Sequence, residues 1–86
     1  MDIRTAFGRN LRDLRLTRRL SQEELAFRAQ IDRTYMSSIE RGQANPTLVV
    51  LDRLARALRV PLTELVELDR ALRPAAANLR RGRRLR

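Results

Sequence analysis

The sequence predicts an all-α fold, with five helices in one small domain followed by a basic C-terminal tail. Apolar residues recur at helical spacing along most of the chain. No segment alternates apolar and polar residues over the length of a strand. The 86 residues suit one domain with one modest core. We expect the domain to span residues 1–69 and the tail to span residues 70–86.

The first helix is expected from about residue 2 to residue 18, where apolar residues recur every three to four positions. Its inward face would consist of Ile3, Phe7, Leu11 and Leu14.

The second helix is expected to start in "LSQEEL" and to run to about residue 29. Ser21 and Glu24 have the spacing of a capping box, in which each side chain bonds the backbone N–H of the other residue. Leu20 and Leu25 flank this cap and form a hydrophobic staple.

The stretch "IDRTYMSSIERG" repeats the same device and predicts a short third helix. Asp32 is a good N-cap, and Ile31 and Met36 are spaced as a second staple. Gly42 supplies the C-terminal stop. Because isolated helices this short are marginal, packing must hold the helix in place.

The fourth helix is expected after Thr47, which serves as its cap. Its inward face would consist of Leu48, Leu51, Leu54, Ala55 and Leu58. The fifth begins near Pro61, which suits a first helical turn, and ends at Pro74 at the latest. Its apolar residues are Leu62, Leu65, Val66 and Leu68.

The charge of the chain is concentrated in the tail. Residues 1–69 contain 12 Arg and all 10 acids, whereas residues 70–86 contain seven Arg and no acid. There is no Lys, which reflects either a preference for the forked contacts of Arg or a GC-rich genome. This distribution indicates an anionic partner without identifying it.

The composition argues against several classes of protein. The chain has no Cys and no His, so we expect no catalytic residues, no metal site and no cofactor. No apolar run approaches the roughly 18–20 residues of a membrane span, and the N-terminus lacks the layout of a signal peptide. A cytoplasmic protein without a membrane partner is therefore expected.

A helical wheel of the third helix separates an apolar side from a polar strip. The apolar side holds Tyr35, Met36 and Ile39. The polar strip holds Arg33, Thr34, Ser37, Ser38 and Arg41. Small hydroxyl residues permit close approach to another surface, and Arg suits phosphate or guanine. The combination fits a helix that lies in the DNA major groove, which admits one helix.

Residues 22–41 resemble the helix-turn-helix motif of the lambda repressor/Cro-like regulators. The apolar positions of that motif are filled by Leu25, Ala26, Ala29, Ile31, Met36 and Ile39. The following "RGQANPTL" is similar to the family's loop into its fourth helix. The resemblance covers about residues 5–68 and implies a lambda repressor-like domain with residues 33–41 as the recognition helix.

The resemblance also implies roles for individual residues. The residues that would read bases are Arg33, Thr34, Ser37 and Ser38. The residues that would contact the DNA backbone are Gln22, Arg15, Tyr35, Arg41 and Asn45. Arg15 and Glu40 occupy the positions of a buried ion pair, which would orient Arg15 towards a phosphate.

Three positions depart from the family pattern. Arg19, Gln30 and Arg59 stand where family members often have Gly, at positions that tend towards left-handed backbone. We expect each to cost roughly 1 kcal/mol in stability. Phe27 points away from the Leu25–Ala29 side of its helix. It would either lie against Arg stems, which we favour, or cover the surface of a partner.

The expected function is that of a regulator that binds double-stranded DNA specifically, as a homodimer on a two-fold operator. The dimer interface would use Leu62 and Val66. The fifth helix needs only one apolar stripe to face the core, and these two residues are apolar beyond that need. One alternative is a protein-interaction module, such as an antitoxin that binds a partner protein. Another is a non-specific nucleic-acid binder that acts through the Arg-rich tail.

Overall fold

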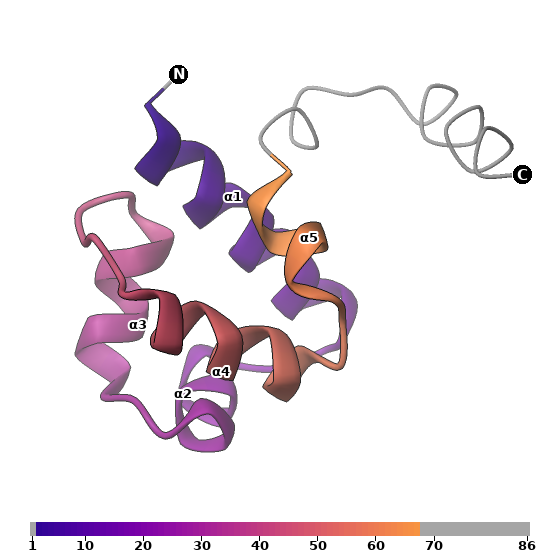
Figure 1. Cartoon of the computed structure of the whole chain (residues 1–86). Helices are drawn as coiled ribbons and strands as arrows, with labels where there is room; N and C mark the ends of the chain where they lie inside the picture. The colour runs from indigo at the N-terminus through magenta and orange to yellow at the C-terminus, as the bar shows by residue number, and fades with distance from the viewer. Residues whose placement is uncertain (1, 68–86) are drawn as a thin grey trace, which may run out of the picture.

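The computed structural model describes residues 2–67, which form five helices without a strand (Figure 1). The helices are α1 (Ile3–Thr17), α2 (Gln22–Ala29), α3 (Arg33–Glu40), α4 (Leu48–Leu58) and α5 (Leu62–Val66). The predicted all-helical class and the order of the five helices are confirmed. The expected basic tail and Leu68 lie outside the described residues.

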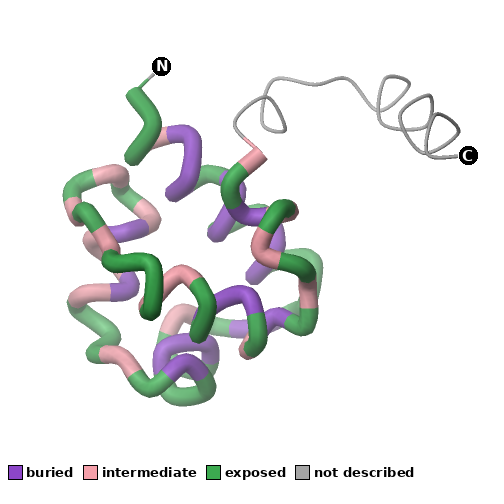
Figure 2. The backbone as a smooth tube through the Cα atoms, in the orientation of Figure 1, coloured by how far each residue is buried: buried purple, intermediate pink, exposed green. Residues whose placement is uncertain are grey.

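One core joins all five helices. α1 packs against α3 and α5, α2 packs against α3 and α4, and α4 packs against α5. Every helix contributes buried residues, so the buried segments in Figure 2 converge on the interior. The largest fully buried apolar side chains are Leu11, Leu25, Met36, Ile39, Leu54, Leu58 and Leu65. Burial of each removes roughly 1.5–3 kcal/mol of unfavourable hydration, which stabilises helices too short to form alone.

The N-terminal caps that the sequence predicts for α2, α3 and α4 are present. The Ser21 Oγ accepts from the Glu24 backbone N–H at 3.0 Å, and a Glu24 carboxylate oxygen accepts from the Ser21 N–H at 2.8 Å. Asp32 caps α3, and Thr47 caps α4. These bonds satisfy N–H groups that have no partner inside the helix.

The left-handed backbone expected at three non-glycine positions is confirmed. Arg19, Gln30 and Arg59 have φ angles of 59°, 60° and 60°. Gln30 and Arg59 end α2 and α4 as their C-caps. Gly42 follows α3 with φ of 76°, where glycine carries no steric penalty.

Two apolar residues expected in the core are on the surface. Ile3 is 60% exposed and Leu48 is 72% exposed. Each is the first residue of its helix. Phe27 is 84% exposed, so the expected cover by Arg stems is wrong for most of this side chain.

Candidate nucleic-acid interface

Helix α3 presents one face to the core and the opposite face to solvent. Met36 and Ile39 are buried against the other helices. The polar strip begins with Arg33 and Thr34, which are both exposed. It continues with Ser37 and Ser38, which are half-buried. In Figure 1, α3 lies at the edge of the molecule.

The N-terminal end of α3 is fixed by its cap. A carboxylate oxygen of Asp32 accepts from the Thr34 backbone N–H at 2.9 Å.

Tyr35, predicted as a contact to the DNA backbone, is half-buried and packs against the core.

At the other end of α3, Arg41 folds back along the helix. Its Nη1 donates to the Oγ of Ser37, and its Nε donates to the side-chain oxygen of Gln43 at 3.2 Å. The Gln43 backbone N–H donates in turn to the Ser38 carbonyl at 2.9 Å. Gln43 is therefore a partner of Arg41 that the sequence does not predict, although the two residues are only two positions apart.

Arg15 and Glu40 form an ion pair between α1 and the last turn of α3. The Arg15 Nε lies 2.6 Å from Glu40 Oε2, and Nη2 lies 3.1 Å from Oε1. Nη1 donates to the Leu20 carbonyl at 2.8 Å. The two side chains are only 10% and 4% exposed. The pair therefore ties the end of α1, the following loop and α3 together.

Gln22 joins the same network from the first position of α2. Its Nε2 donates to Glu40 Oε1 at 3.0 Å, and the residue is half-buried. The resemblance predicts Gln22 as a phosphate contact, and its bond to Glu40 is a further partner that the sequence does not predict. Two polar residues 18 positions apart carry no local signal that they meet.

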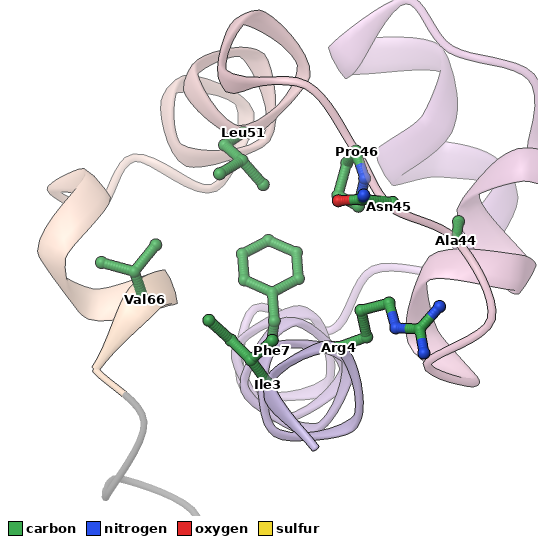
Figure 3. A pocket seen from close by; sticks show the side chains of 8 residues that line it. All are labelled: Ile3, Arg4, Phe7, Ala44, Asn45, Pro46, Leu51 and Val66. Carbon is green, nitrogen blue, oxygen red and sulfur yellow. The ribbon is translucent and has the colours of Figure 1, made fainter.

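Asn45 lies in the α3–α4 loop, is exposed, and borders a largely apolar hollow of about 170 Å³ (Figure 3). The Phe7 ring projects into the hollow, and Val66 and Leu51 approach it from α5 and α4. The hollow is thus a surface feature beside α5 and the N-terminal end of α1.

The two residues expected in a dimer interface differ in exposure. Val66 is 40% exposed and stands at the hollow. Leu62 is half-buried and packs against the core of its own chain.

Within residues 2–67, no cluster of acidic side chains is arranged to hold a metal ion. No helix in the same part of the chain has both the length and the apolar character needed to cross a membrane.

A family model described as a helix-turn-helix domain matches residues 6–68. The chain is 40% identical over 67 residues to the control protein C.BamHI of Bacillus amyloliquefaciens, spanning 77% of this chain and 83% of that protein. It is similar to the crystal structure of the restriction-modification controller protein C.AhdI from Aeromonas hydrophila, with 47% identity and a TM-score of 0.71. That match covers 72% of this chain and 94% of the controller. It is also 37% identical over 60 residues to the phage CTXphi repressor RstR of Vibrio cholerae, covering 70% of this chain and 54% of the repressor.

Proposed function

Because the chain belongs to the helix-turn-helix family of lambda repressor/Cro-like regulators, we propose that it is a transcriptional regulator that places α3 in the major groove of double-stranded DNA. The family consists of regulators rather than enzymes. One observation carries the proposal: the exposed face of α3 offers Arg and hydroxyl side chains, while its other face is locked into the core. A rigid helix with such a face can place hydrogen-bonding groups against base edges.

Base reading is assigned to Arg33 and Thr34 at the exposed start of α3, and to Ser37 and Ser38 farther along. The Ser37 Oγ accepts from Arg41, which leaves its own O–H available to donate to a base acceptor. Arg41, Asn45, Tyr35 and Gln22 are assigned to phosphates. Arg15 is nearly buried and each of its three nitrogens donates within the protein, so it first holds the motif together. Two of its five N–H groups remain for the expected phosphate contact.

Selection of bound sequences from a random duplex pool tests this function. We expect one enriched motif with two related half-sites about one helical turn apart. A pool that shows no enrichment, with equal affinity for every duplex, would contradict specific recognition and favour a non-specific nucleic-acid binder.

We propose that the chain acts as a homodimer through the surface around Val66. Val66, Ile3 and the hollow beside them expose apolar surface at one end of the molecule. Leu62 would contribute through the small part of its side chain that its own core leaves uncovered. Sedimentation of Val66→Asp should show a shift towards monomer, whereas Thr63→Asp, an exposed neighbour, should leave assembly unchanged.

The Arg-rich residues 70–86 are proposed to add affinity without specificity, because phosphate contacts carry no sequence information directly. Deletion of residues 74–86 should make binding less dependent on salt. The log–log slope should become shallower by about 0.9 for each phosphate that the shortened chain no longer neutralises. The preferred sequence should stay the same. Failure of the shortened chain to dimerise, with an unchanged slope, would instead assign this segment to assembly.

A further inference from the structure

We propose that Glu40 positions the side-chain amide of Gln22 for a DNA phosphate, so that one carboxylate fixes both the recognition helix and a backbone contact. This inference rests on the proposed function, since it assumes that α3 enters the major groove. It assigns to Glu40 a positioning role beyond its ion pair with Arg15.

The hydrogen bonds at Glu40 carry the inference. Oε2 accepts from the Arg15 Nε, and Oε1 accepts from both the Arg15 Nη2 and the Gln22 Nε2. Two bonds from Arg15 therefore fix the carboxylate that binds Gln22. Because Glu40 is only 4% exposed, it has little freedom to release the amide to water.

The ion pair with Arg15 neutralises the charge of Glu40, which would otherwise lie near the DNA phosphates. An isolated carboxylate near the DNA backbone would repel phosphate, but the charge of Glu40 is matched by Arg15 at 2.6 Å. The pair is neutral overall, so its effect on DNA binding comes from the hydrogen bond that it offers to Gln22. It fixes where the Gln22 amide nitrogen lies.

The chemistry of a primary amide leaves Gln22 able to bind an anion. Its Nε2 has two N–H groups, and one of them is committed to Glu40. Among the described residues, no acceptor is found for the second. With the first N–H held, the rotamer freedom of this long side chain is restricted before DNA arrives, which reduces the entropic cost of the contact.

Arg15 is held more tightly than Gln22. All three guanidinium nitrogens donate to Glu40 or to the Leu20 carbonyl, and the side chain is 10% exposed. We therefore propose that the ion pair orients Gln22 in addition to Arg15, which keeps two of its five N–H groups for the expected phosphate contact.

A double-mutant cycle on the full chain tests the coupling. Gln22→Ala should weaken binding to the selected duplex about tenfold, the effect of removing a hydrogen bond to a charged group. Glu40→Asp keeps the charge for Arg15 but withdraws the carboxylate by one methylene. In that background, Gln22→Ala should cost less than about twofold. Gln43→Ala is the matched control, because Gln43 bonds Arg41 and not Glu40, and its effect should be the same in both backgrounds.

The salt dependence gives a second measure of the same variants. Gln22 is neutral and displaces no counterion, so Gln22→Ala should weaken specific and non-specific duplexes alike with an unchanged log–log salt slope. Equal costs of Gln22→Ala in the two Glu40 backgrounds would overturn the positioning role. So would full affinity of Gln22→Ala in the native background. If the native chain binds no duplex at all, the proposed function itself fails. If it binds duplex DNA but the two costs of Gln22→Ala are equal, only this inference fails.

The side-chain amide signals of Gln22 decide the matter if Glu40→Asp does not fold. In the NMR spectrum of the unmodified protein without DNA, one Nε2 proton should already be shifted by its bond to the carboxylate. Addition of duplex should shift mainly the other proton. If both protons in the free protein instead resonate where those of a solvent-exposed glutamine amide do, the inference is contradicted.

Discussion

Gly8 of α1 lies so close to the last turn of α3 that a Cβ atom at this position would stand 2.5 Å from the Glu40 carbonyl oxygen. It would also lie 2.6 Å from the Ile39 carbonyl oxygen. Both neighbours are backbone atoms, which cannot swing aside. The absence of a side chain at Gly8 therefore sets the approach of α1 to α3, and with it the reach of Arg15 to Glu40.

Gly8→Ala should destabilise the domain although alanine is the better helix former. The propensity gain is about 1 kcal/mol, whereas overpacking costs typically 1–3 kcal/mol and here displaces two helices. Because both neighbours are backbone atoms, we expect the upper half of that cost, about 2–3 kcal/mol, and hence a net loss of about 1–2 kcal/mol in chemical denaturation, together with weaker DNA binding. Arg9→Ala, at the exposed neighbouring position, should be close to neutral. A stabilised Gly8→Ala variant would show that α1 can move away without cost.

Gln30→Gly should stabilise the chain. Gln30 ends α2 with φ of 60° and ψ of 46°, a conformation in which glycine avoids a steric penalty of roughly 1 kcal/mol. Part of that gain is offset by the greater freedom of glycine in the unfolded state. We expect an increase of about 0.5 kcal/mol in the free energy of unfolding. Arg28→Gly, inside the same helix, should lower it by about 1 kcal/mol.

The capping box of α2 should make stability depend on pH in the acidic range. The backbone N–H of Ser21, helped by its hydroxyl, lowers the pKa of Glu24 below its ordinary 4.5. A depressed pKa in the folded state means that the charged carboxylate stabilises the fold above the unfolded pKa, and that this contribution is lost as the pH falls through the folded pKa. Glu24→Gln should therefore be less stable than the native chain at pH 7, with the difference vanishing towards low pH. Glu23→Gln controls for the loss of a charge in the same turn, and an equal pH profile for both variants would contradict the cap.

The sequence was sufficient for the features that depend on near neighbours. The caps at Ser21, Asp32 and Thr47 act over two or three residues, so their side chains could be recognised directly. The left-handed turns at Gln30 and Arg59 followed from the comparison with a family pattern that places Gly there.

The sequence was insufficient for features that depend on where helices end in space. Ile3 and Leu48 fit the apolar stripes of their helices but are mostly exposed at the helix starts, which periodicity alone cannot reveal. The bond from Gln22 to Glu40 and the close approach at Gly8 arise only when α1, α2 and α3 are assembled. The exposed face of α3 could be predicted, because a helical wheel needs only local geometry.

The role of Arg33 as a base-reading residue provides the most direct test of the proposed interface. Arg33 is exposed at the first position of α3, where a guanidinium can bond two acceptors of a guanine in the major groove. Arg33→Ala should weaken binding to the selected duplex by about 1–3 kcal/mol and relax preference at one base pair. Repeating the selection with this variant measures both effects. Arg53→Ala, which removes an exposed Arg from α4, should leave the base preference unchanged. If Arg33→Ala instead weakens every duplex equally and lowers the salt slope by about 0.9, Arg33 contacts a phosphate, and base reading must fall to Thr34 and the two serines.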